Sequence, residues 1–133
     1  MILIVEDHAD TRRALLRLLS LDGYEGVPAG CGQDALTFLR LNKPRLVILD
    51  CGLPDIDGLE VFRAIRSDPR LNDTRVVMFS AYDGSRRDEA LAAGVDAYVL
   101  KGSLDLLHLL GEIRRFAGPP TRTLANERRT RTA

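Results

Sequence analysis

The chain has 133 residues, and its 45% hydrophobic content is enough to build the core of one ordinary domain. Its 19 basic and 19 acidic residues cancel, but the last dozen residues hold Arg122, Arg128, Arg129 and Arg131, which leaves the rest of the chain mildly acidic. This balance argues against a nucleic-acid-binding surface.

Short aliphatic runs alternate with helical patterns along the chain, and the alternation predicts a regular order of strands and helices. In chain order the expected elements are a strand over 2–5, a helix over 12–23, a strand over 24–29, a helix over 32–43, a strand over 45–50, a helix over 58–67, a strand over 75–80, a helix over 85–93, a strand over 97–100 and a helix over 104–116.

Capping residues mark several of these helix ends. Asp57, followed three residues later by Glu60, predicts the start of the third helix, and Ser103 predicts the start of the fifth. Gly23 and Gly94 predict the ends of the first and fourth helices, because glycine readily adopts the left-handed conformation that terminates a helix.

Five strands that alternate with five helices predict an α/β fold of the flavodoxin-like, doubly wound (βα)5 type. The five-stranded parallel sheet would carry helices on both faces, because parallel neighbours need crossover connections. Residues 45–50 are aliphatic on both faces, which favours a central strand. The domain is expected to span 1–117, and 118–133, which lack periodicity, are expected to form a disordered basic tail.

Polar or charged residues stand at the ends of four of the five predicted strands. Glu6 and Asp7 follow the first strand, Asp50 ends the third, Ser80 ends the fourth and Lys101 follows the fifth. In an open parallel sheet, ligands bind outside the carboxyl ends of the strands. We therefore expect these side chains to share one rim of the domain.

Three carboxylates at one rim require a cation, since two charges about 4 Å apart repel by about 4 kcal/mol at an effective dielectric near 20. Oxygen ligands without cysteine or histidine favour a hard ion, and a site with few carboxylates suits Mg²⁺ better than Ca²⁺. With Mg²⁺ and Lys101 present, Asp50 is a competent nucleophile for a phosphoryl group. Ser80 and Lys101 would bind two of the phosphoryl oxygens.

Simpler roles are open for each of these residues alone. Asp50 could be a turn residue, Glu6 and Asp7 could begin a solvated turn, and Ser80 could be a capping hydroxyl. Their coincidence at four strand ends favours a site. His108 is expected on a helix surface and not as a ligand.

Other phosphate chemistries lack their sequence motifs. No GxxxxGK[ST] or GxGxxG loop and no GxSxG elbow is present, which disfavours nucleotide-binding and hydrolase sites. A phosphatase of the haloacid dehalogenase type carries a second Asp two residues after the first, and Gly52 stands at that position.

In these motifs the sequence resembles the receiver domains of bacterial two-component response regulators, over residues 1 to about 116. The resemblance is carried, in order, by LIVEDHADTRRALLRLL, DALTFLRLNKPRLVILDCGLPDIDGLEVFRAIR, RVVMFSA and GVDAYVLK. The roles that it implies are phosphoacceptor for Asp50, magnesium ligands for Glu6, Asp7, Asp50 and the backbone carbonyl of Gly52, switch hydroxyl for Ser80, phosphate-binding cation for Lys101 and aromatic switch for Tyr98.

The resemblance implies a phosphorylation switch. A sensor histidine kinase or phosphotransfer protein would transfer its phosphoryl group to Asp50, Ser80 would move toward it, and Tyr98 would turn inward. The face formed by the fourth helix, fifth strand and fifth helix would then change its protein partners. Tyr98 could equally be a core aromatic, and a receiver-fold interaction module that works without phosphorylation is the alternative function.

The resemblance also implies what the chain does not do. It would be no enzyme beyond catalysing its own phosphorylation and dephosphorylation, would contact neither nucleic acid nor membrane, and would be a monomer or weak homodimer. No output domain is expected after Phe116, so the chain resembles a stand-alone receiver.

Two positions depart from the common family pattern. Gly102 stands where proline commonly follows the lysine, and Leu53 stands where methionine is common. Near the pocket, Gly52 and Tyr82 are expected to influence the lifetime of a phosphorylated Asp50.

The cysteines and the first residues predict a cytoplasmic protein. Cys31 and Cys51 are twenty positions apart without a CxxC pair, which favours free thiols in a reducing compartment. The opening MILIV is too short for a signal peptide core and has no basic leader, and no other run has the length of a membrane span.

Overall fold

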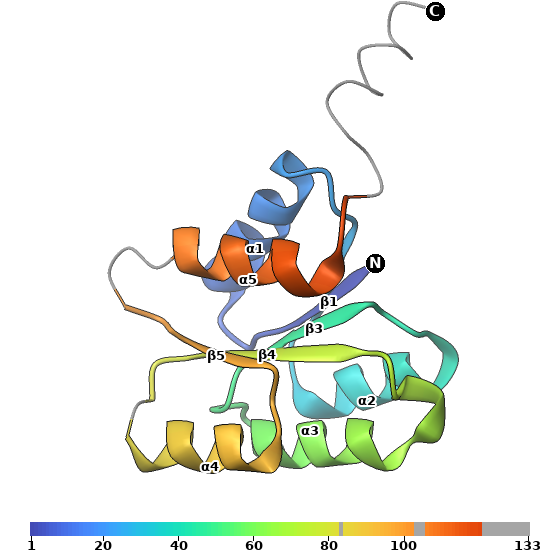
Figure 1. The fold of residues 1–133 in the computed structure, drawn as a ribbon, viewed down its shortest axis with the longest axis vertical. Coiled ribbons are helices and arrows are strands. Elements are labelled where there is room, and N and C mark those ends of the chain that lie inside the picture. Colours follow the sequence, from blue (N-terminus) through green and yellow to red (C-terminus); the bar gives the residue numbers. More distant parts are fainter. Residues whose placement is uncertain (83, 103–105, 121–133) are drawn as a thin grey trace, which may run out of the picture.

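The computed structural model describes residues 1–82, 84–102 and 106–120, which form a parallel sheet between two layers of helices (Figure 1). In chain order the elements are β1 (Ile2–Val5), α1 (Ala9–Leu21), β2 (Gly26–Ala29), α2 (Gly32–Leu41), β3 (Leu46–Leu49), α3 (Gly58–Ser67), a short 3-10 helix η1 (Pro69–Leu71), β4 (Arg75–Ser80), α4 (Ser85–Ala93), β5 (Ala97–Leu100) and α5 (Leu106–Ala117).

The predicted doubly wound fold is confirmed by the order of the strands, which is β2-β1-β3-β4-β5 with every pair parallel. Strand β3 lies in the centre, as its aliphatic sequence predicted. Helices α1 and α5 cover one face of the sheet, and α2, α3 and α4 cover the other (Figure 1). The sheet is therefore buried on both faces, which explains the continuous apolar strands.

Each face of the sheet has its own hydrophobic core, because successive strand residues point to opposite sides. Leu49 and Met78 belong to the core under α2, α3 and α4. Ile48 and Val77, their neighbours in the chain, belong to the core under α1 and α5. The two cores together hold the strands rigidly, and their carboxyl ends carry the candidate site.

The predicted helix ends agree with the structure at several positions. Asp57 caps α3, and its Oδ1 accepts a hydrogen bond from the Leu59 amide at 3.0 Å. Gly23 and Gly94 follow the ends of α1 and α4 with φ of 86° and 105°, the left-handed region that favours glycine.

Other boundaries differ from the prediction. Helix α1 begins at Ala9, three residues earlier than expected, because His8 caps it and accepts a hydrogen bond from the Thr11 amide. Helix α2 ends at Leu41, two residues early, and β2 and β3 are shorter than predicted. The sequence prediction did not include η1. Ser103, the predicted cap of α5, lies outside the described residues.

The chain beyond α5 is described as far as residue 120. Tyr24 Oη donates a hydrogen bond of 2.7 Å to the Gly118 carbonyl, so the first residue after α5 is held against the segment between α1 and β2. The rest of the predicted tail lies outside the described residues. In the described ranges no peptide bond is cis, the one between Lys101 and Gly102 included, and no helix has the length and apolar character needed to cross a membrane.

Candidate functional site

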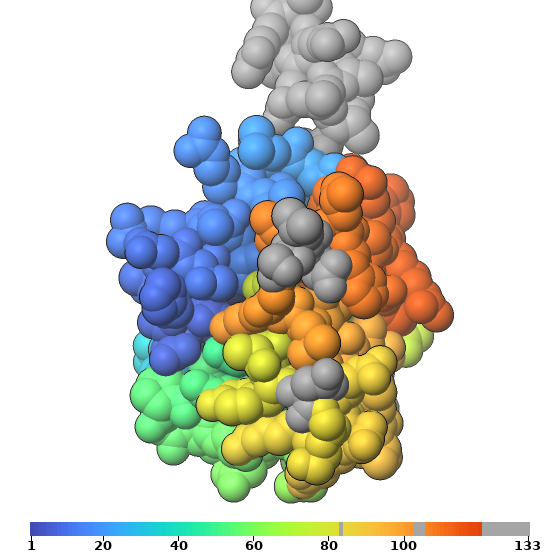
Figure 2. Space-filling view, turned by 90° about the vertical axis from the view of Figure 1, so that its left-hand side faces the viewer, coloured from blue at the N-terminus to red at the C-terminus, as the bar shows by residue number. Residues whose placement is uncertain are grey.

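The candidate site lies at the carboxyl end of the sheet, where the predicted polar residues meet. Glu6 follows β1, Asp50 follows β3 and Lys101 follows β5. This end of the domain faces the viewer in Figure 2, and segments from the blue, green, yellow and orange parts of the chain come together there. The polar residues at the predicted strand ends therefore meet at one rim, as expected for the carboxyl ends of parallel strands.

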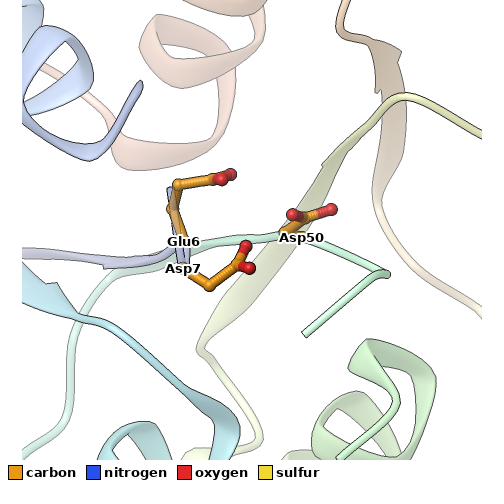
Figure 3. A group of neighbouring side chains, drawn as sticks. All are labelled: Glu6, Asp7 and Asp50. Carbon is orange, nitrogen blue, oxygen red and sulfur yellow. The ribbon is translucent and has the colours of Figure 1, made fainter. Parts of the chain in front are cut away.

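Three carboxylates form the acidic part of the site. Glu6, Asp7 and Asp50 each offer an oxygen, and these oxygens all lie within 4.8 Å of one another. Glu6 and Asp50 are buried and Asp7 is exposed. All three carboxylates point toward the same space in Figure 3. A set of oxygen ligands with excess negative charge fits Mg²⁺, which prefers a few carboxylates and retains several waters.

Lys101 joins two of these carboxylates. Its ammonium Nζ donates to Glu6 Oε2 at 2.5 Å and to Asp50 Oδ2 at 3.0 Å. Burial opposes the charge on Lys101, but the hydrogen bonds to Glu6 and Asp50 hold its pKa above the ordinary value. Burial raises the pKa of Glu6, more than the hydrogen bond from Lys101 lowers it. The ammonium therefore stays protonated and neutralises part of the acidic cluster.

Backbone contacts hold the two acidic segments in place. The Gly52 amide donates to Asp50 Oδ1 at 3.2 Å, which orients the carboxylate at the start of the loop. Arg12 Nη1 donates to the Glu6 carbonyl at 2.9 Å and so fixes the segment between β1 and α1. The sequence prediction missed Arg12. An arginine in the first turn of a helix that follows an acidic pair is a signal that could have predicted this contact.

Ser80 and Tyr98 lie behind the acidic cluster. Ser80 is fully buried, and its Oγ accepts a hydrogen bond of 3.2 Å from the Tyr82 amide. Within the described residues Ser80 Oγ makes no hydrogen bond to Asp50 or Lys101. Tyr98 is buried, and its hydroxyl donates to the Tyr82 carbonyl at 2.5 Å. Tyr98 thus packs inward in this structure, and a joint movement of Ser80 and Tyr98 on phosphorylation stays a prediction.

Tyr98 should ionise unusually late. Burial raises the pKa of its phenol to about 12, from an ordinary value of 10.0, against a hydrogen bond from Ser80 that lowers it. Because the neutral phenol is favoured in the folded state, stability should be unaffected below pH 10 and should fall as the pH rises toward 12. Ultraviolet titration of phenolate checks this: Tyr98→Phe should remove the last phenol to ionise, and an unchanged late step would contradict the assignment.

Tyr82 covers the turn that follows Asp50. A Cβ built on Gly52 would lie 3.0 Å from Tyr82 Cε2, so the ring rests on the glycine. The Arg86 guanidinium lies 4.9 Å from the centroid of this ring, and its Nη1 is 3.3 Å from Asp57 Oδ2. Arg86 gave no sequence signal, because its ionic partner Asp57 is 29 residues away in the chain.

The remaining sequence-predicted residues lie as follows. His108 is exposed on α5 and lies 3.8 Å from Glu112, one helical turn away, in agreement with the expected surface position. Leu53 is partly buried against the core under α2, α3 and α4. The role of the Gly52 carbonyl as a metal ligand stays a prediction.

Comparison with protein families gives a match over most of the chain. Residues 2–113 match the family described as the response regulator receiver domain. Over 101 residues the chain is 40% identical to the probable transcriptional regulator ycf27 of Cyanophora paradoxa and 40% identical to the response regulator MprA of Mycobacterium sp. (strain KMS). The match covers 75% of this chain in both cases, and 41% and 43% of those proteins, so the chain spans less than half of their length.

Solved structures show the same likeness. The response regulator TrrA of Thermotoga maritima, crystallised in complex with Mg²⁺–BeF, superposes with a TM-score of 0.76 at 33% identity, covering 86% of this chain and 96% of that one. A putative response regulator from Chloroflexus aurantiacus gives a TM-score of 0.81 at 28% identity, covering 87% and 95% of the two chains.

Proposed function

Because this chain belongs to the response regulator receiver family, we propose that it is a phosphorylation switch that accepts a phosphoryl group on Asp50. The donor is a histidine kinase or phosphotransfer protein, and the reaction depends on Mg²⁺. Phosphorylation changes the protein contacts of the face formed by α4, β5 and α5. The folded unit for this role spans residues 1–117. The chain is a signalling protein that catalyses only its own phosphorylation and dephosphorylation.

One observation carries the proposal: the Lys101 ammonium lies 3.0 Å from Asp50 Oδ2 inside a cluster of three carboxylates. A fixed cation beside Asp50, which is rigidly held at the end of a central strand, supports its role as the nucleophile. Fixed charges at the reacting group stabilise the transferring phosphoryl without reorganisation. A lone capping Asp needs no such cation.

The chemistry follows from these groups. A carboxylate oxygen of Asp50 attacks the phosphorus of a phosphohistidine, a P–O bond forms, and the P–N bond breaks with its electron pair going to the imidazole. When bound at Glu6, Asp7 and Asp50, Mg²⁺ supplies positive charge for the phosphoryl oxygens. Lys101 pairs with one phosphoryl oxygen, and Ser80 donates a hydrogen bond to another. Water later hydrolyses the acyl phosphate and returns the free carboxylate and inorganic phosphate.

A magnesium requirement is supported by the acidic cluster and by the Mg²⁺–BeF complex of TrrA. The relatives named as transcriptional regulators are longer than this chain, so no transcriptional activity is carried over from them. We also propose that the switch works in the cytoplasm. The two free thiols, Cys31 and Cys51, suit that reducing compartment.

The proposal is tested by measuring intact mass after incubation with Mg²⁺ and acetyl phosphate. With this donor the P–O bond to acetate breaks, in place of the P–N bond of phosphohistidine. The protein should gain one phosphoryl group. Asp50→Asn should gain none, because the amide is a poor nucleophile, and excess chelator should prevent the gain in the unaltered protein. If the unaltered protein gains nothing from several donors, the alternative is favoured: a receiver-fold interaction module that works without phosphorylation.

A further inference from the structure

We propose that a basic groove at the amino end of the sheet binds an acidic peptide segment of a partner protein. The groove has a volume of about 250 Å³. Its lining residues include Lys43, Arg45, Arg70, Asp73, Arg75 and Phe116. This site goes beyond the proposed function, since it lies at the end of the domain away from Asp50 and uses none of the residues around it.

The fold brings these cations together from segments that are distant in the sequence. Arg45 immediately precedes β3 and Arg75 is the first residue of β4. The Arg75 amide donates to the Arg45 carbonyl at 3.0 Å, so the two arginines start neighbouring strands. In Figure 1 the strands begin on the right, near the N-terminus and the end of α5, and run toward the site on the left.

The charges of the groove are only partly neutralised. Arg75 Nη1 lies 3.2 Å from Asp96 Oδ1, and Arg70 Nη2 lies 3.5 Å from Asp68 Oδ2. Lys43 and Arg45 are exposed, and within ranges 1–82, 84–102 and 106–120 neither has an ion pair. The groove thus carries four cations and one carboxylate in a chain whose formal net charge is zero. Such a concentration of one sign selects an anionic partner.

The surroundings of the groove favour peptide carboxylates over nucleic acid. Asp73 lines the groove, and Asp68 and Asp96 pair with two of its arginines. These carboxylates interrupt the positive surface and disfavour a continuous phosphate backbone more than a peptide, whose flexible side chains can direct their carboxylates toward Lys43 and Arg45. Pro44 and Phe116 give the lining apolar carbon as well. Spaced carboxylates can each meet a guanidinium in the bidentate geometry that arginine favours, while the intervening peptide packs on the apolar atoms.

The chain also leaves the domain beside this groove. A Cβ built on Gly118 would lie 3.5 Å from the guanidinium nitrogens of Arg45, so the end of α5 borders the groove. The sequence that follows contains four arginines. Binding to the groove must therefore be separated from binding to those arginines in any test.

The test measures binding of a fluorescein-labelled hexaglutamate peptide to the full chain by fluorescence anisotropy. The double variant Lys43→Glu/Arg45→Glu should weaken binding by about 10-fold or more, equivalent to about 1.4 kcal/mol. The matched double variant Arg17→Glu/Arg87→Glu makes the same change of net charge. Its two arginines are exposed on α1 and α4 and have no ion pair in the described part of the chain. Binding of the peptide to this control variant should therefore weaken by less than about 2-fold.

A third variant replaces Arg122, Arg128, Arg129 and Arg131 with glutamine and should retain most of the binding. Asp50→Asn should bind as the unaltered protein does, so failure of the phosphorylation proposal and failure of this one are distinguishable. Circular dichroism verifies that each variant is folded.

Four results would overturn the proposal. They are the absence of saturable binding, equal losses in the groove variant and its matched control, a loss confined to the glutamine variant, and tighter binding of a short duplex DNA or of inorganic phosphate than of the peptide. Loss confined to the groove variant, with amide shifts in a ¹⁵N spectrum at Arg45 and Arg75, would support it.

Discussion

Replacing Lys101 with alanine is expected to slow phosphorylation of Asp50 by acetyl phosphate by about 100-fold or more. The ammonium bridges Glu6 and Asp50, so its removal leaves two buried carboxylates facing an incoming phosphoryl group without their fixed cation. Removal of one preorganised charge from such a site commonly costs a factor of 100 to about 1000 in rate. The rate is measured by intact mass over time at saturating Mg²⁺.

The other lysine provides the matched control. Lys43→Ala removes an exposed ammonium at the far end of the sheet, and phosphorylation should proceed at the unaltered rate. Lys101→Met, which retains the length of the side chain, serves if the alanine variant folds poorly. An unchanged rate in folded Lys101 variants would show that the cation beside Asp50 has a structural role only.

The strands and the rim of the site were predictable from the sequence for a physical reason. An aliphatic run with a polar residue at its end, as in residues 46–50, has few alternatives to a buried strand that delivers a side chain to the sheet edge. Parallel topology then places Glu6, Asp50 and Lys101 at the same edge. Three local patterns and one topological rule together were enough to predict that these side chains meet at one rim.

The remaining features depend on contacts between distant segments, which no local pattern encodes. Arg86, in α4, pairs with Asp57, the cap of α3, which is 29 residues away in the chain. The groove likewise brings together Arg45, which precedes β3, and Arg75, the first residue of β4. The early start of α1 was missed because histidine is an uncommon cap, although the cap residue of α3 was found from its usual motif.

Gly58 shows how closely the loop after Asp50 is packed. It is the first residue of α3, and its amide donates to the Cys51 carbonyl at 3.0 Å. A Cβ built on Gly58 would overlap the backbone carbonyl oxygen of Asp50 and lie 2.8 Å from Cys51 Cα. Both neighbours are backbone atoms, which cannot turn away as a side chain can. The start of α3 or the Asp50 loop would have to move.

Gly58→Ala is therefore expected to destabilise the domain by about 3 kcal/mol, the upper part of the range for overpacked interiors. Urea unfolding followed by circular dichroism measures the change, with the midpoint lowered at an unchanged slope. Because the clash is with Asp50 itself, phosphorylation should also slow in the folded fraction.

The matched control for this substitution is Gly111→Ala in α5, where an added Cβ meets no atom within 4 Å. Alanine in a helix interior is favoured over glycine, so this variant should gain about 0.5 to 1 kcal/mol. The two substitutions add the same methyl group and should change stability in opposite directions. If Gly58→Ala were as stable as the unaltered protein, the contact between the start of α3 and the Asp50 backbone would be looser than the structure describes, and the rigid placement of Asp50 would need another explanation.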